Sequence, residues 1–167
     1  MGKKIAYEQV EGKIKDLIAS APDPQVAEII EGHLFLGSQD AALNLQELEA
    51  KNVKFILNVA FGVSNAFPNL FTYKNVEILD VEESDVSFHF EDCFQFINLA
   101  KKENKGVLVH CNAGISRSST IVIAYIMKHL SLPFQEAHQM VKAKRERIKP
   151  NPGFVRQLEL YEKVLNK

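Results

Sequence analysis

The chain has 167 residues, 46% of them hydrophobic and 25% charged, with a formal net charge of −1 at pH 7. This length is enough for one domain with a substantial core, and the composition is ordinary for a globular protein. The near-neutral charge gives no indication of nucleic-acid binding, no apolar run approaches the length of a membrane span, and two cysteines are too few for a disulfide framework.

Residues 1–28 predict an amphipathic helix followed by a connector. Apolar residues recur at helical spacing across Lys3–Ala19, and Ser20–Pro24 is rich in residues that end a helix. Because no separate linker follows this helix, we expect it to pack on a domain formed by residues 29–167. Position 6 is not the Ser or Thr that N-myristoylation favours, so we expect Gly2 to be unlipidated.

The next elements alternate between strand and helix. His33–Leu36 and Val53–Ala60 read as short buried strands, with helical spacing over Asp40–Ala50 between them. After a loop, Thr72–Leu79 reads as a third strand that ends at Asp80. Such alternation predicts an α/β domain.

A second helix follows the acidic loop Glu82–Asp85, and either Ser84 or Ser87 suits its N-cap. Its apolar residues share one face: Val86, Phe90, Cys93, Phe94, Ile97 and Ala100. We therefore interpret Cys93 as a core residue rather than a redox partner.

The most informative stretch is Gly106–Thr120, which reads GVLVHCNAGISRSST. A short apolar strand leads into the loop Cys111–Arg117, and Ile121–Leu130 beyond it has the apolar character of a buried helix. A loop between a strand and a helix N-terminus is suited to anions, because backbone N–H groups converge there and the helix dipole favours negative charge.

The residue types in this loop indicate chemistry. A helix N-terminus favours the thiolate, the nucleophilic form of a cysteine such as Cys111. Arg117 offers a planar fork of donors for two phosphate oxygens, and the Ser118 hydroxyl is placed to reach the sulfur or to cap the helix. A lone cysteine is more often a buried structural residue, but an arginine and a run of hydroxyls would add nothing to an apolar core.

Two helices complete the chain. Pro133 suits a helix start, and Asn151 with Pro152 predicts an N-cap and first turn for the last helix. Between them, Lys142–Lys149 holds five positive charges and one glutamate. We interpret this segment as a solvated helix end, with docking of a partner as the alternative.

His110–Ser118 resembles the signature loop of the cysteine-based protein tyrosine phosphatases, and its AGISRS sequence resembles the dual-specificity branch. Leu34–Ser38, Ile56–Val59 and Pro150–Leu158 resemble other segments of that branch, so the resemblance covers roughly residues 30–165. The chain is similar to a small, atypical dual-specificity phosphatase. This resemblance implies a mixed, largely parallel central sheet of about five strands with helices on both faces, and a site at the C-terminal ends of the strands.

The resemblance also implies hydrolysis of phosphotyrosine and phosphoserine or phosphothreonine through a cysteinyl phosphate. Cys111 would be the nucleophile, Ser118 would stabilise the departing thiolate, and His110 would orient Cys111. The phosphate would be bound by the loop, which comprises Asn112, Ala113, Gly114, Ile115, Ser116 and Arg117.

The reaction also needs a proton donor for the leaving oxygen. Asp80 is the favoured candidate, since it directly follows a strand and has the family's spacing of about thirty residues before the cysteine. A loop-capping role is the alternative for Asp80, and Asp85 is the second candidate for the acid.

We expect no cofactor and no metal, because the five histidines are scattered along the sequence. The expected partner is a phosphorylated protein, with no nucleic acid and no membrane insertion, and the sequence does not indicate an oligomeric state. A thiolate nucleophile needs a reducing compartment, either cytoplasm or nucleus.

The substrate class is inferred from the loop. Phosphoinositide phosphatases of the superfamily tend to carry loop lysines where Asn112 and Ile115 stand here, so a protein substrate is favoured. A phosphoinositide or other non-protein substrate is the alternative, followed by a non-catalytic phosphoprotein-binding module.

Overall fold

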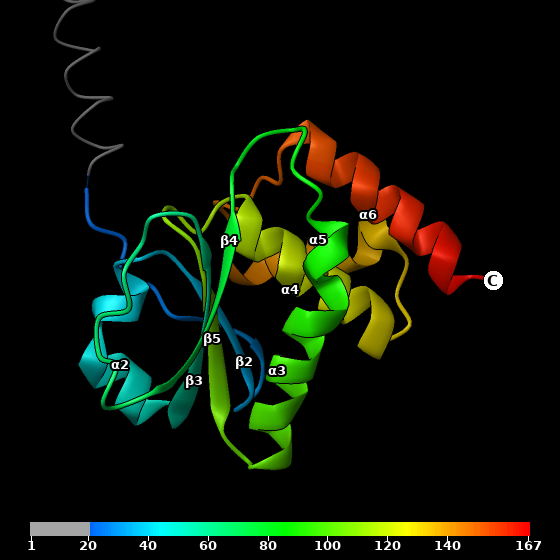
Figure 1. Ribbon diagram of the computed structural model, residues 1–167. Coiled ribbons are helices and arrows are strands. Elements are labelled where there is room, and N and C mark those ends of the chain that lie inside the picture. Colours follow the sequence, from blue (N-terminus) through cyan, green and yellow to red (C-terminus); the bar gives the residue numbers. More distant parts are fainter. Residues whose placement is uncertain (1–20) are drawn as a thin grey trace, which may run out of the picture.

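A five-stranded mixed sheet forms the centre of the computed structural model, which describes residues 21–167 (Figure 1). The strand order is β1–β2–β5–β3–β4, with β1 antiparallel to β2 and every other pair parallel. The strands are β1 (Ala27–Ile30), β2 (Leu34–Gly37), β3 (Val53–Ala60), β4 (Thr72–Ile78) and β5 (Gly106–His110). The expected mixed, largely parallel sheet is confirmed, while the helix expected over Lys3–Ala19 lies outside the described residues.

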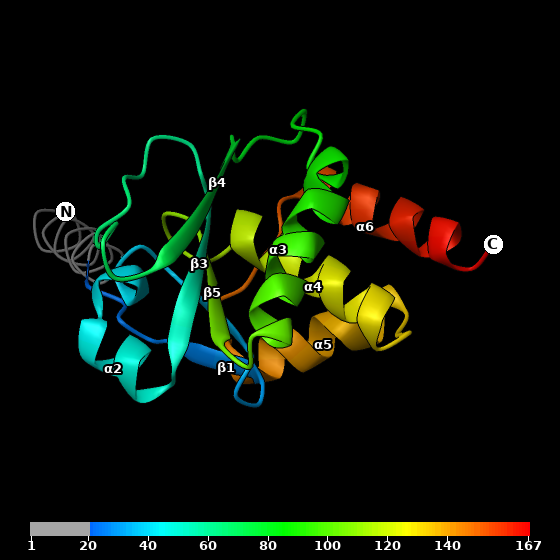
Figure 2. The same cartoon turned by 60° about the horizontal axis from the view of Figure 1, so that its bottom comes forward.

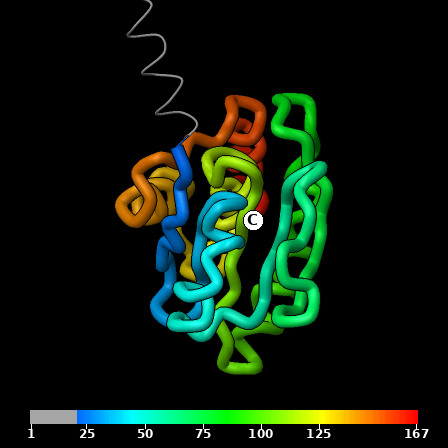
Figure 3. The backbone as a smooth tube through the Cα atoms, turned by 90° about the vertical axis from the view of Figure 1, so that its left-hand side faces the viewer, coloured from blue at the N-terminus to red at the C-terminus, as the bar shows by residue number. Residues whose placement is uncertain are grey.

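Helices cover both faces of the sheet, as expected (Figure 2). On one face lie the short helix α2 and a 3-10 turn, and α2 crosses in front of the strands in Figure 3. The other face carries the four longer helices, α3 to α6. The helical elements are η1 (Ala41–Leu43), α2 (Leu45–Ala50), η2 (Ser87–His89), α3 (Phe90–Lys102), α4 (Arg117–His129), α5 (Phe134–Lys144) and α6 (Pro152–Leu165).

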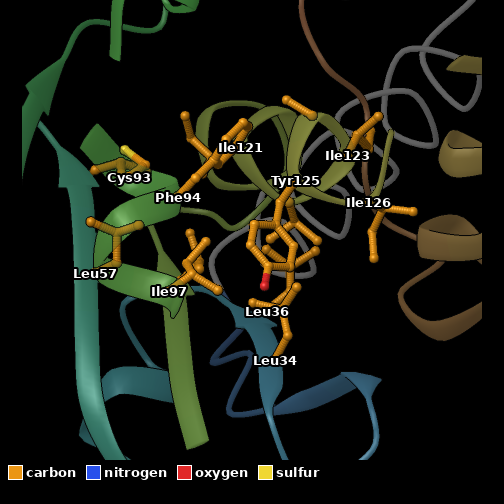
Figure 4. Close-up of a cluster of buried hydrophobic side chains, with 14 of the residues drawn as sticks. Leu34, Leu36, Leu57, Cys93, Phe94, Ile97, Ile121, Ile123, Tyr125 and Ile126 are labelled. Atoms are coloured by element: carbon orange, nitrogen blue, oxygen red, sulfur yellow. The ribbon is translucent and has the colours of Figure 1, made fainter. Parts of the chain in front are cut away.

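The centre of the sheet is apolar because it is covered on both sides. All five residues of β5 are buried, and ten consecutive residues of α4, from Ser118 to Met127, are buried with them. Figure 4 shows Ile121 of α4 near Phe94 of α3 and Tyr125 of α4 above Leu36 and Leu34 of β2, while Ile123 and Ile126 extend from the other side of α4. The all-round apolar character of Ile121–Leu130 is thereby explained: α4 is sandwiched between the sheet and its neighbouring helices.

The structure differs from the sequence expectation in four local features. The predicted helix Asp40–Ala50 is divided into η1 and α2, and strand β1 was not anticipated. β1 crosses the expected domain boundary at residue 28. The helix start after the acidic loop is stabilised neither by Ser84 nor by Ser87: the Asp85 carboxylate accepts hydrogen bonds from Ser87 Oγ at 2.7 Å and Phe88 N at 3.1 Å.

A search of the described helices for a segment long and apolar enough to cross a bilayer finds none between residues 21 and 167.

Leu57→Ala should lower the free energy of unfolding by about 2–5 kcal/mol, because the truncation leaves a cavity in a packed core. Leu57 lies on β3 and is completely buried. Leu99→Ala on α3 is the matched control, since Leu99 is 44% exposed, and its effect should stay within about 0.5 kcal/mol. Denaturant unfolding measures both, and equal losses would contradict the described core.

Candidate active site

The signature loop (Cys111–Arg117) lies at the C-terminal end of β5, where His110 is the last strand residue and Arg117 the first residue of α4. The sequence places the loop there because the buried strand and the buried helix are both fixed by the core. As expected for a parallel sheet, β4 ends at the same edge, so Asp80 lies there too, two residues beyond Ile78.

The Cys111 sulfur faces hydrogen-bond donors of its own loop. The Gly114 backbone N–H donates to Cys111 Sγ at 3.2 Å, and Ser118 Oγ lies 3.2 Å from the same sulfur. Cys111 is 2% exposed. The predicted approach of Ser118 to the sulfur is therefore present, and both contacts are suited to stabilising a negative charge on sulfur.

The loop's carbonyl oxygens point away from the sulfur, into the surrounding protein, where other parts of the chain satisfy them. Asn112 O accepts from Gln39 N at 2.9 Å and Ile115 O from Lys149 N at 2.8 Å. In a trans peptide the C=O and the following N–H point in opposite directions. Outward carbonyls thus leave the amide N–H groups of the loop facing the side on which the sulfur lies, as the Gly114 N–H does.

Gly114 is required by two features of the loop. Its φ of +66° lies in the left-handed region, and a Cβ there would stand 2.5 Å from the carbonyl carbon and oxygen of Gly37. The loop is therefore pressed against the end of β2, which leaves no room for a side chain at this position.

Arg145 holds two more of the outward carbonyls. Its Nε donates to Gly114 O at 2.9 Å and its Nη2 to Ala113 O at 3.1 Å. The side chain is completely buried and pairs with Asp23, at 2.5 Å between Nη2 and Oδ2. The interpretation of Lys142–Lys149 as a solvated helix end is wrong for this residue, since Arg145 reaches inward beneath the signature loop.

Asp23 is ionised in this arrangement. Burial by itself would raise the pKa of Asp23, but the hydrogen bond and charge of Arg145, with the charge of Arg147, outweigh it and lower that pKa below its usual value. The pair therefore links the chain before β1 to the support of the signature loop, a contact that no sequence pattern indicated.

Arg117 joins the loop to the strand that precedes Asp80. Its Nη1 donates to Ile78 O at 3.0 Å, while its buried Nε has no hydrogen-bond partner among the described residues. The guanidinium is thus oriented by β4 with donor capacity remaining for an anion in the loop.

Asp80 is exposed beside the signature loop, where its Oδ1 accepts a hydrogen bond from Asn151 Nδ2 at 2.9 Å. Asp80 lines a pocket of about 520 Å³ together with Ile115 and Ser116 of the loop. Asp85, the alternative acid, is engaged elsewhere. Its hydrogen bonds from Ser87 and Phe88 lower the pKa of its carboxyl and hold it at the start of η2.

His110 and Cys93 have the surroundings expected of them. His110 Nδ1 lies 2.9 Å from Cys111 O, and burial lowers the pKa of the imidazole, so a neutral ring can donate to that carbonyl. This contact orients the Cys111 backbone. Burial raises the pKa of Cys93 to about 12, which keeps its thiol protonated within the core. Across residues 21–167 no cluster of three His, Cys, Asp or Glu side chains forms a metal site.

Arg145→Met should lower the free energy of unfolding by about 3–5 kcal/mol, because it leaves two buried loop carbonyls without a donor and Asp23 without its buried partner. Arg147→Met is the matched control: Arg147 also contacts Asp23, at 2.9 Å, but is 48% exposed and should contribute no more than about 1 kcal/mol.

The same pair sets a pH dependence. A carboxyl whose pKa is lowered by folding stabilises the protein above its unfolded-state pKa, and that stability is lost as the pH falls through the folded-state value. The stability difference between wild type and Arg145→Met should thus shrink in acid. A difference that is absent at neutral pH would contradict the buried pair.

Comparison with known proteins identifies the family of the chain. The family model "Dual specificity phosphatase, catalytic domain" matches residues 34–164. Dual specificity protein phosphatase 19 of Mus musculus is 48% identical over 151 residues, which are 90% of this chain and 67% of that protein. Slingshot homolog 1 of Homo sapiens is 45% identical over 138 residues, 83% of this chain but only 13% of that protein. A relative from Dictyostelium discoideum is 45% identical over 144 residues, and this chain covers 63% of its length.

Two solved human structures share the fold. The tyrosine phosphatase-like serine/threonine/tyrosine-interacting protein has a TM-score of 0.81 and 34% identity, over 85% of this chain and 98% of that one. DUSP28 has a TM-score of 0.81 and 31% identity, over 88% of this chain and 97% of that one. With its matched domain, its relatives and its signature loop, the chain belongs to the family of dual specificity phosphatase catalytic domains.

Proposed function

We propose that the protein hydrolyses phosphate monoesters on phosphorylated proteins, at tyrosine and at serine or threonine, through a phosphocysteine intermediate. The observation that carries the proposal is the environment of the Cys111 sulfur. The sulfur accepts a hydrogen bond from the Gly114 N–H and lies beside the Ser118 hydroxyl, in a loop whose carbonyl oxygens point outward. Such a loop binds the phosphate oxygens through its amides and Arg117, and it places the phosphorus next to the sulfur.

In the first step, the Cys111 thiolate attacks phosphorus and the bond from phosphorus to the ester oxygen breaks. The electron pair of that bond goes to the leaving oxygen, which takes a proton from the Asp80 carboxyl. Arg117 and the loop amides stabilise the charge on the three remaining phosphoryl oxygens. The position of Asp80 beyond β4, beside Ile115 and Ser116, supports its assignment as the acid.

In the second step, a water molecule attacks the phosphocysteine while the Asp80 carboxylate removes its proton. The bond from sulfur to phosphorus breaks, its electron pair returns to sulfur, and inorganic phosphate leaves. The Ser118 hydroxyl and the Gly114 N–H, each 3.2 Å from the sulfur, stabilise the departing thiolate.

Two rival functions weigh less. The loop residues Asn112 and Ile115 carry no charge for the additional phosphates of a phosphoinositide. A non-catalytic phosphoprotein-binding module would need neither the Cys111 sulfur with its two hydrogen-bond partners nor a carboxylate such as Asp80 beside the loop. The chemistry of a thiolate nucleophile also favours a reducing compartment, the cytoplasm or the nucleus.

Cys111→Ser should abolish turnover of an aryl phosphate while retaining binding of inorganic phosphate or vanadate, since the loop amides and Arg117 hold the anion. Cys93→Ala is the matched control, because Cys93 is buried far from solvent and its loss should leave activity within a few-fold. Steady-state kinetics and calorimetry measure the two properties. Appreciable activity in Cys111→Ser would refute the covalent mechanism.

Asp80→Asn should reduce kcat by about 10²–10⁴-fold on a phenolic ester with a poor leaving group, and much less when the leaving group departs readily as an anion. The basic limb of its pH–rate profile should disappear, while the acidic limb remains. Asp85→Asn is the control and should show neither change, since the Asp85 carboxylate accepts hydrogen bonds from Ser87 and Phe88 of η2. If Asp85→Asn rather than Asp80→Asn gave these changes, the assignment of the acid would be wrong.

A further inference from the structure

The start of α6 lies against the segment that carries Asp80. Gly153 packs so closely that a Cβ there would stand 2.2 Å from Glu82 O, and Arg156 Nη2 lies 2.8 Å from Glu82 Oε2. One turn further, Gln157 Nε2 donates to Ser84 O at 2.8 Å and its Oε1 accepts from Ser87 N at 3.1 Å. The first turns of α6 therefore support the whole segment from Asp80 to Ser87.

Asn151, the N-cap of α6, makes three hydrogen bonds of 2.9 Å that connect this support to the active site. Its Oδ1 accepts from Phe154 N, which fixes the amide so that Nδ2 points outward and donates to Asp80 Oδ1. Its backbone N–H donates to Ser116 Oγ in the signature loop. One residue is thus bonded to the carboxylate on one side and to the phosphate-binding loop on the other.

We propose that Asn151 is a positioning residue for proton transfer, which holds Asp80 at a fixed place relative to the signature loop. This inference rests on the proposed role of Asp80 as acid and base. Within residues 21–167, Asn151 is the hydrogen-bond partner of the Asp80 side chain. With Oδ1 engaged by the amide, Oδ2 is the oxygen that gives the proton to the leaving group and later takes one from water.

The test uses Asn151→Ser, because serine is as good an N-cap as asparagine and retains the backbone N–H to Ser116, while it cannot reach Asp80 as the amide does. The expected result is a loss of about ten-fold in kcat on a phenolic ester with a poor leaving group. The loss should be small for a good leaving group, with KM unchanged. Asn151→Asp should lose at least as much on the poor leaving group, since a carboxylate cannot donate a hydrogen bond to Asp80 Oδ1.

Gln157→Ala is the matched control. It removes two contacts between α6 and the supported segment but touches neither Asp80 nor the signature loop. If Asn151→Ser lowered thermal stability yet left kcat and the dependence on leaving group unchanged, or merely reproduced Gln157→Ala, Asn151 would be only a helix cap.

A double variant separates this inference from the assignment of the acid. In the Asp80→Asn background, adding Asn151→Ser should cause no further loss, because the positioned group is absent. A further loss as large as that of Asn151→Ser alone would overturn the proposal. If Asp80→Asn lowers kcat equally for poor and good leaving groups, the error lies in the assignment of Asp80 as the acid and not in the role of Asn151.

Discussion

The site depends on one constraint: peptide N–H groups can converge on an anion only if the carbonyls of the same loop are satisfied on its outer side. A buried carbonyl without a donor costs about 1–3 kcal/mol. Here the donors come from four separate parts of the chain. They are Gln39, Arg145, Lys149 and the hydroxyls of Ser119 and Thr120. The surrounding domain thereby keeps the amide N–H groups of the signature loop on its inner side, which is the preorganisation that the proposed electrostatic catalysis requires.

Arg145 differs from the other donors because its side chain carries a charge and is completely buried. A buried guanidinium is tolerated only because Asp23 neutralises it and the carbonyls of Ala113 and Gly114 occupy its remaining donors. The proposed acid is supported differently, from the start of α6, and Arg117 connects the two parts by donating to Ile78, two residues before Asp80. The proposed nucleophile and anion site thus share one segment, the proposed acid belongs to another, and the two segments are supported by different neighbours.

Much of the fold could be predicted because its core is patterned. The uniformly apolar Val107–Val109 and Ile121–Leu130 indicated a buried strand and a buried helix, and the Asn151–Pro152 cap marked the start of α6 correctly. Spacing along the loop likewise placed Ser118 near the Cys111 sulfur. These features are local, so the sequence alone carries them.

The features that sequence reasoning missed are long-range. Arg145 stands among five basic residues, and nothing in its neighbours distinguishes the buried one, because its partner Asp23 lies 122 positions away. The amide of Asn151 was identified as a cap, but its bond to Asp80 joins residues 71 positions apart. A short strand such as β1, with one side at the sheet edge, has too weak a pattern to be recognised.

The most direct test of the account is the identity of the phosphorylated atom during turnover. Wild-type protein should be mixed with an aryl phosphate, quenched in acid within the first turnover, digested and analysed by mass spectrometry. One phosphoryl group is expected on the peptide that contains Cys111, attached to the sulfur, so that Cys111 is protected from alkylation by a thiol-reactive reagent while it carries the phosphoryl group. A phosphoryl group on another side chain, or rapid turnover with none on the protein, would contradict it.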